Sequence, residues 1–355
     1  MDNSSHVSNG PCPLSVSVFF TTVLAVISLT AFIGNISLMT VVYKTPSLRT
    51  STNFYYVNIA VSDFLSSLTS WPLYFTDEII VSPGILIQGR LATSGCKIGV
   101  YVRLVSTSVS ILSLLLIATD RYIAVVFPFK TSLLLSRKVR ITTLVAAWAV
   151  SMGYSFPMLY FSKVEDVGEE RFCRFAWNDT VTLIIYYVSG ITMINVVPRI
   201  VIVILYSRFM QTLRKKINSR PLFGSINSEG KRNKEMQNIM KIFKSIVIAY
   251  TACFFLLCSA IHVFLVLKMF FPEILTKDKC KWILGFSYFV FPLLSTAINP
   301  IILFLFSSNF RHALQTLWPF RLKNFCCSCC KKRKEEDPIR QDEQVELQIL
   351  VKNIN

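Results

Sequence analysis

Long apolar runs alternate with short breaks that carry charge, proline or glycine along most of the chain. Seven runs are long enough to cross a bilayer, at residues 14–43, 53–78, 92–126, 140–161, 181–207, 240–268 and 282–306. About 20 apolar residues span the hydrocarbon core as a helix, so the longer runs must tilt or project beyond it. The pattern predicts an all-α membrane protein, a bundle of seven transmembrane helices.

The runs also predict how the chain is divided. We expect an extracellular tail over residues 1–13, the transmembrane domain over 14–306, a short amphipathic juxtamembrane helix over 307–320 and a cytoplasmic tail over 321–355. The extracellular tail is too short to fold as a binding domain. Anything bound from outside must therefore reach the bundle and its loops.

The composition excludes a soluble globular protein. The 355 residues are 53% hydrophobic and only 16% charged, with a mean hydropathy of +0.52. Soluble domains carry about 25% charged residues. The excess of apolar residues lies in the long runs, as expected for membrane spans.

Lysine and arginine set the expected orientation. None precedes Lys44, and the later ones gather in alternate breaks between the runs. Because cytoplasmic loops carry the excess of these residues, we expect the amino terminus outside the cell and the carboxyl terminus inside. The net charge of +17 is also typical of nucleic-acid binding, but its division by membrane side argues against nucleic acid as a partner.

Four cysteines lie on the expected outer side, where the surroundings are oxidising and disulfides form. We expect the pairs Cys96–Cys173 and Cys12–Cys280, with two free thiols as the alternative for the second pair. The Asn-x-Ser/Thr acceptors at Asn3 and Asn178 lie on the same side and are predicted glycosylation sites.

A second group of cysteines follows the predicted juxtamembrane helix and precedes a basic cluster. Its members are Cys326, Cys327, Cys329 and Cys330. Their spacing also occurs in zinc sites, but no histidine or further cysteine pair follows. Juxtamembrane cysteines beside basic residues are typical of S-palmitoylation, so we expect acyl chains that anchor this segment in membrane lipid.

Charged residues interrupt the apolar runs at two notable places. Asp63 is a carboxylate in the middle of the second run, and the triplet Asp120-Arg121-Tyr122 lies at the inner end of the third. Charges in or near hydrocarbon must be paired or solvated. Both places are therefore candidate functional sites.

These features resemble the rhodopsin-like (class A) G-protein-coupled receptors from about residue 20 to residue 320. The matching motifs are Gly34-Asn35, Asn58 to Asp63, Trp148, Pro198, Tyr206 and Asn299-Pro300, with Phe310 where the family's eighth helix lies. The resemblance implies a plasma-membrane receptor that converts binding of an extracellular ligand into activation of a heterotrimeric G protein.

The resemblance makes Arg121 the output of the receptor. In the family this arginine pairs with the preceding acid at rest and moves toward the residue matched by Tyr206 on activation. The residues so assigned to coupling and switching are Asp120, Arg121, Tyr122, Pro128, Phe129, Tyr206, Asn299, Pro300, Ile111, Pro198 and Phe255. The alternatives are a simple ion pair at the membrane edge and ordinary helix packing.

The resemblance also implies an allosteric sodium ion, and no other metal or cofactor. Its ligands would be Asp63, Ser110, Ser295 and Asn299, whose oxygens suit a hard cation. The alternative is a neutral Asp63 that is hydrogen-bonded to Asn35 and Asn299.

Three substitutions depart from the family pattern. Ser259 and Ile261 replace the tryptophan and proline of the sixth helix, and Leu303 replaces the tyrosine after Asn299-Pro300. Without the proline the sixth helix need not kink strongly. We expect a shifted resting balance with raised basal activity.

The ligand pocket predicted from the resemblance includes Arg103, Tyr101, Asp77, Glu78, His262 and Tyr288, with Tyr186 nearby. Arg103 stands where amine receptors carry aspartate, and Leu293 where opsins carry lysine, so neither an amine nor retinal is expected. Arg103 has two interpretations: an internal salt bridge to Asp77 or Glu78, or a clamp for an anionic group.

A peptide is the favoured ligand, because the acidic loop over 162–180 can attract a basic peptide; a solvated hairpin gives the same composition. A small anion, nucleoside or lipid ligand, or a constitutively active receptor, is the alternative. Arg199, after Pro198, is expected to face lipid or a partner, or to contact another helix.

Other classes of function fit the sequence less well. A seven-span transporter or channel would show inverted repeats, which are absent, and no sequence motif indicates an enzyme. The tail has no serine or threonine cluster beyond Lys331. We therefore expect weak engagement of arrestin by a phosphorylated tail.

Overall fold

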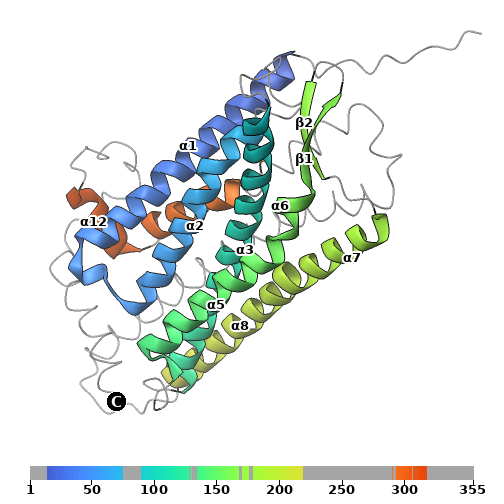
Figure 1. The fold of residues 1–355 in the computed structure, drawn as a ribbon. Helices are drawn as coiled ribbons and strands as arrows, with labels where there is room; N and C mark the ends of the chain where they lie inside the picture. Colours follow the sequence, from blue (N-terminus) through green and yellow to red (C-terminus); the bar gives the residue numbers. More distant parts are fainter. Residues whose placement is uncertain are drawn as a thin grey trace, which may run out of the picture.

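The structure, a computed structural model, describes residues 14–74, 89–127, 129, 134–167, 170–175, 179–218, 290, 293–305 and 307–317. Figure 1 shows long helices laid side by side, with a short hairpin beside the start of α3. The helical elements are α1 (Leu14–Lys44), the 3-10 turn η1 (Pro46–Leu48), α2 (Ser51–Tyr74), α3 (Arg90–Val126), α5 (Arg137–Ser155), α6 (Pro157–Phe161), α7 (Thr180–Gly190), the π-helical turn η3 (Ile191–Val196), α8 (Val197–Asn218), Leu293–Leu305 and α12 (Ser308–Leu317).

The helices confirm the expected class of all-α membrane protein. Within the described ranges, four are long and apolar enough to cross a membrane, namely Val18–Lys44, Arg90–Val126, Arg137–Phe161 and Val181–Thr212. A fifth is obtained if the bent pair Leu293–Leu305 and Asn309–Leu317 counts as one span. The run predicted over 240–268 lies outside the described residues.

The central helix of the described bundle is α3, which packs against α2, α5, α8 and the hairpin. Its contact with α2 is the most extensive, and small hydroxyl side chains line it. The Ser106 hydroxyl donates to the Ser62 carbonyl over 2.6 Å, and the Ser62 and Ser110 hydroxyls lie 3.0 Å apart. Short serine side chains allow two helices to approach closely while their hydroxyls stay hydrogen-bonded.

Local sequence explains where α5 and α6 begin and end. Ser136 caps α5, because its hydroxyl accepts the Val139 N–H over 3.4 Å. Pro157 follows the end of α5 and occupies the first turn of α6, where its missing N–H is not needed. The run predicted over 140–161 is therefore two helical segments joined at a proline.

The fifth run forms one long helix with a widened turn. The turn η3 lies directly before Pro198, where the Val197 N–H reaches the Thr192 carbonyl. Proline has no N–H and crowds the carbonyl four residues earlier, and a π turn relieves both. The helix continues to Asn218, beyond the predicted end at residue 207, because the arginines and lysines there favour helix.

Asp179 starts this helix. Its carboxylate accepts the backbone N–H groups of Val181 and Thr182, each over 3.1 Å, and the Thr182 hydroxyl. The hydrogen bond from the Thr182 side chain, followed by the backbone bonds, lowers the pKa of Asp179. The cap is therefore present above the ordinary pKa of aspartate and is lost as the pH falls through the lowered value.

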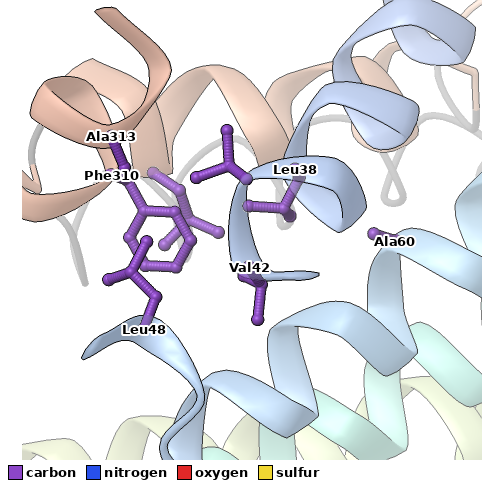
Figure 2. Close-up of a cluster of buried hydrophobic side chains, with 8 residues drawn as sticks. Leu38, Val42, Leu48, Ala60, Phe310 and Ala313 are labelled. Atoms are coloured by element: carbon purple, nitrogen blue, oxygen red, sulfur yellow. The ribbon is translucent and has the colours of Figure 1, made fainter. Parts of the chain in front are cut away.

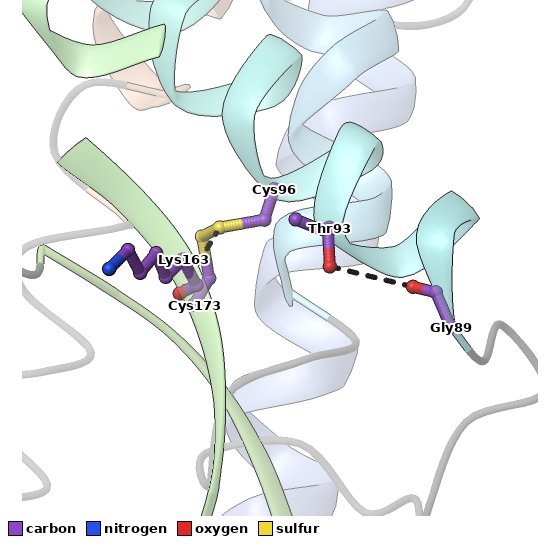
Figure 3. The surroundings of a disulfide bond; sticks show 5 residues. All are labelled: Gly89, Thr93, Cys96, Lys163 and Cys173. Carbon is purple, nitrogen blue, oxygen red and sulfur yellow. Dashed lines mark hydrogen bonds between the residues drawn. A yellow bond between two sulfur atoms is a disulfide. The ribbon is translucent and has the colours of Figure 1, made fainter. Parts of the chain in front are cut away.

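The predicted acidic loop contains an antiparallel hairpin of β1 (Ser162–Val167) and β2 (Glu170–Phe175), which the sequence analysis did not assign as strands. Cys173 faces Val164 across the ladder and is joined to Cys96 of α3. Figure 3 shows this disulfide between the hairpin and the start of α3. The expected Cys96–Cys173 pair is confirmed, and it fixes the hairpin to the bundle.

The helix α12 turns back onto the inner ends of α1 and α2. Phe310 and Ala313 are buried against Leu38, Val42 and Leu48, as Figure 2 shows. Leu303 belongs to the same cluster and is 6% exposed. The leucine at the family's tyrosine position therefore packs into an apolar cluster.

Candidate functional site

The carboxyl-terminal end of α3 carries the candidate output site, and Asp120 there forms an ion pair with α5. Arg140 of α5 places both Nε and a terminal nitrogen on one carboxylate oxygen of Asp120, at 2.9 Å and 2.8 Å. This is the one ion pair found among the described residues. The expected resting pair of Asp120 with Arg121 is therefore not formed in this structure. The physical reason is that α5 presents a guanidinium on the side of α3 where Asp120 lies.

Arg121 is not paired with its neighbouring acid in this structure. Its Nε is buried and has no hydrogen-bond partner within the described part of the chain. Tyr56 of α2 and Tyr206 of α8 lie within electrostatic range of the Arg121 guanidinium. The movement of Arg121 toward Tyr206 on activation stays a prediction.

The segment after α3 exposes an aromatic side chain on the inner side. Tyr122 lies edge-on to Phe127, with ring centroids 6.3 Å apart. Phe129 is 86% exposed, and Pro128 lies outside the described residues. A large apolar side chain this exposed is suited to burial by a partner.

The second polar site surrounds Asp63, which is buried in the middle of the bundle. Ser110 of α3 donates to one carboxylate oxygen over 2.7 Å, and the Asn299 amide donates to the other over 2.5 Å. Asn35 does not contact Asp63; its amide donates to the carbonyls of Ala31 and Thr296. The alternative in which Asn35 bonds Asp63 is therefore wrong for this structure.

These donors test whether a cation would fit. Ser110 has its hydroxyl oxygen within reach of Asp63, and Ser295 is half-buried on the same helix as Asn299. The amide of Asn299 presents its nitrogen to Asp63, so it would have to turn to offer oxygen. The residue types fit a hard cation, and the described residues contain no cluster of histidine, cysteine or carboxylate ligands for a transition metal.

The motif residues of the second, third and fourth runs form one further network. The Trp148 indole donates to the Asn58 side-chain carbonyl, and the Asn58 amide donates to Ser113, each over 2.8 Å. One asparagine thus joins α2, α3 and α5. Because Ser113 is buried, Asn58 and Trp148 are half-buried, and their hydrogen bonds are made to one another, this network positions helices rather than binding a ligand.

The outer pocket is described only in part. Arg103 is 7% exposed and Tyr101 is half-buried on α3. Tyr186 does not point freely into a cavity, because it stacks on Tyr154 of α5 with centroids 4.8 Å apart. Each hydroxyl of this pair donates to the other residue's carbonyl, over 2.6 Å and 2.8 Å.

Of the expectations for Arg199, contact within the bundle fits this structure and contact with lipid does not. Arg199 is 4% exposed, so it faces the bundle rather than lipid, and it donates to the Asn195 side-chain oxygen over 2.9 Å. The π turn before Pro198 contributes this partner, because Asn195 lies within η3. Pro198 is the sequence signal for this turn, because proline disrupts the regular helical hydrogen bonding before it.

Sequence reasoning missed Arg140 and Tyr154 as site residues. Arg140 was counted only among basic residues, although its place in the first turn of the fourth run was visible. Of the residues assigned to switching, Ile111 and Pro198 are buried. The remaining predicted positions lie outside the described residues: Phe255, Asp77, Glu78, His262, Tyr288, Cys12, Cys280, Asn3, Asn178, Cys326, Cys327, Cys329, Cys330, Ser259 and Ile261.

Comparison with known families gives one match that covers most of the chain. The model of the family described as "7 transmembrane receptor (rhodopsin family)" matches residues 34–303. This range contains the Asp63 network, the Asp120–Arg140 pair and the disulfide.

The individual relatives have low sequence identity to this chain, but their matches cover half of it or more. A QRFP-like peptide receptor of Branchiostoma floridae is 28% identical over 53% of this chain and 50% of its own length. Neuropeptide FF receptor 2 of Rattus norvegicus is 25% identical over 86% of this chain and 72% of its own. The substance-K receptor of Canis lupus familiaris is 25% identical over 94% of this chain and 83% of its own length. The match to the first of these spans half of that receptor's length.

Proposed function

The chain belongs to the rhodopsin family of seven-transmembrane receptors, a family of signalling receptors rather than enzymes, and we propose that it is a peptide receptor that activates a heterotrimeric G protein. The observation that carries the proposal is the state of Arg121. Its neighbouring acid is bound to Arg140, and its own Nε has no hydrogen-bond partner within the described residues. A guanidinium in this position can donate to a carbonyl or carboxylate of a partner that enters from inside.

The inner surface supports the same partner. Phe129 is 86% exposed beside the end of α3, and α8 carries Arg208 and Lys215 toward its inner end. An exposed aromatic side chain suits an apolar face of a partner, and exposed basic groups suit an acidic one. A heterotrimeric G protein is the partner that the family implies.

A peptide ligand is supported from two directions. The relatives named above include a QRFP-like peptide receptor and neuropeptide FF receptor 2. In this chain the hairpin, fixed by Cys96–Cys173 beside the start of α3, carries Glu165, Asp166 and Glu170. These acids can steer a basic peptide toward the bundle. No observation favours a transporter or channel.

The full topology is part of the proposal. Seven spans with the amino terminus outside would place the hairpin outside and Arg121 inside, in the plasma membrane. The divisions at residues 1–13, 14–306, 307–320 and 321–355 follow, with α12 as an eighth helix that lies along the membrane. Its burial of Phe310 against α1 supports this arrangement.

The same proposal assigns the remaining groups. Sodium would be held by Asp63 with Ser110, Ser295 and Asn299, whose oxygens suit a hard cation. Palmitoyl chains on the tail cysteines would bind membrane lipid, and Asn3 and Asn178 would carry glycans. Arrestin would bind weakly, because the tail has few phosphorylatable residues beyond the membrane.

The test is a peptide library screened on cells that express the chain, with G-protein activation as the readout. At least one peptide is expected to activate the wild-type receptor and to lose its effect in the Arg121→Ala variant at equal surface expression. A small anion, nucleoside or lipid that activates in place of every peptide would replace the ligand proposal. Equal responses from wild type and Arg121→Ala would contradict the role of Arg121.

A further inference from the structure

We propose that Arg140 is a positioning residue for Arg121: by holding Asp120 in an ion pair between α3 and α5, it withholds from Arg121 the carboxylate next to it in the chain. The functional part of this inference rests on the function proposed above. Its structural part stands on the geometry of the pair alone.

The pair is closely built. Two nitrogens of Arg140 lie 2.9 Å and 2.8 Å from the same oxygen of Asp120. Ser136 caps α5 and accepts the Arg140 N–H on its carbonyl over 3.1 Å. The helix therefore fixes the backbone of Arg140 in its first turn, opposite Asp120.

Apolar side chains cover one side of the pair. Tyr55, Ile59, Ile117 and Leu144 form a buried cluster. Ile117 lies three residues before Asp120 and Leu144 four residues after Arg140, so each lies on the same helix face as its charged neighbour. The Tyr55 side chain lies close enough to interact with both charges. Low local polarity strengthens the attraction between the two charges.

Because Asp120 is buried, its carboxylate requires a paired cation. Its side chain is 4% exposed, against 17% for Arg140. A buried carboxylate that loses its cation is strongly destabilised unless it finds another. Arg121 is the adjacent cation, so loss of Arg140 is expected to draw Arg121 onto Asp120 and away from the G-protein side.

The first experiment measures thermal unfolding of the purified receptor in lipid nanodiscs. Arg140→Gln is expected to lower Tm by roughly 5 °C or more, and Arg140→Lys to recover part of the loss. Lys138→Gln removes the same charge from an exposed site on α5 and is expected to change Tm by about 1 °C or less.

Double-mutant cycles then identify the partner of Asp120. Asp120→Asn and Arg140→Gln should be strongly non-additive, whereas Asp120→Asn and Arg121→Gln should be additive in the wild-type background. In the Arg140→Gln background the second pair should become coupled. Additive Asp120 and Arg140 substitutions, or an Asp120–Arg121 coupling that is the same with and without Arg140, would overturn the inference.

The second experiment measures basal guanine-nucleotide exchange on a panel of purified G proteins. Arg140→Gln should slow exchange about fivefold or more, and Asp120→Asn combined with Arg140→Gln should restore the rate of Asp120→Asn, because no carboxylate is left to capture Arg121. If Arg140 had a purely structural role, Arg140→Gln would slow exchange equally with and without Asp120→Asn. That result would overturn the functional part of the inference. Wild-type receptor that drives no exchange on any of the G proteins, with or without an activating peptide, would count against the proposed function, while the unfolding cycles would still decide the ion pair.

Discussion

At the scale of single residues, Gly190 shows how closely α5 and α7 approach. A Cβ added there would lie 1.6 Å from the Tyr154 hydroxyl oxygen. That hydroxyl is held by its hydrogen bond to the Tyr186 carbonyl, and the Tyr186 ring stacks on Tyr154. Glycine is therefore required for this contact between the two helices.

Gly190→Ala is expected to destabilise the receptor by about 1–3 kcal/mol, because the tyrosine pair must move. Thermal unfolding in nanodiscs measures the loss. Gly153→Ala on α5 is the matched control, because a Cβ there meets nothing within 4 Å. Combining Gly190→Ala with Tyr154→Ala should remove the clash, and a full Gly190→Ala loss in that background would contradict the explanation.

The sequence predicts which residues are functional better than it predicts their interaction partners. Asp63 could be recognised because a carboxylate in an apolar run needs a partner, and the structure gives it Ser110 and Asn299. The partner of Asp120 could not be recognised, because adjacency in the chain favoured Arg121. Arg140 becomes the partner only through the packing of α5 on α3, which no single-sequence pattern records.

At the scale of elements, α12 depends on a few apolar side chains. The helix has only 10 residues, too few for stable isolated helix formation. Phe310 is 3% exposed within the cluster formed with α1 and η1, and its ring lies edge-on to Phe304 at 6.5 Å. Packing onto α1, rather than intrinsic helix propensity, holds α12 in place.

Phe310→Ala is expected to cost about 3–5 kcal/mol of packing and to release α12 from α1. A spin label at the exposed His312 should then become markedly more mobile in electron paramagnetic resonance spectra. Gln315→Ala, on the exposed face of α12, should leave the label unchanged. Unchanged mobility in Phe310→Ala would show that other contacts hold the helix.

Elements were predicted well where hydropathy alone defines them. The apolar runs locate α1, α3 and the fifth helix to within a few residues at their starts. They could not give the π turn before Pro198, the hairpin over Ser162–Phe175, or the extension of α8 to Asn218. Those features depend on backbone hydrogen bonding and on the disulfide rather than on apolar periodicity.

At the scale of the whole molecule, the Cys96–Cys173 disulfide joins the hairpin to the start of α3 across 77 residues of sequence. Cys96→Ser is expected to lower stability by about 2–4 kcal/mol and to reduce surface expression. The double variant with Cys173→Ser should match the single one, because each removes the same bond. A double variant much more stable than the single would instead indicate that a free thiol mispairs.

The central claim is that Arg121 passes the state of the bundle to a G protein. The most direct measurement is guanine-nucleotide exchange on purified heterotrimeric G proteins by the receptor in nanodiscs, with an activating peptide from the library screen. Wild type should accelerate exchange, and Arg121→Ala, folded and expressed to the same level, should reduce the rate at least about tenfold. Equal rates for the two proteins would contradict the account.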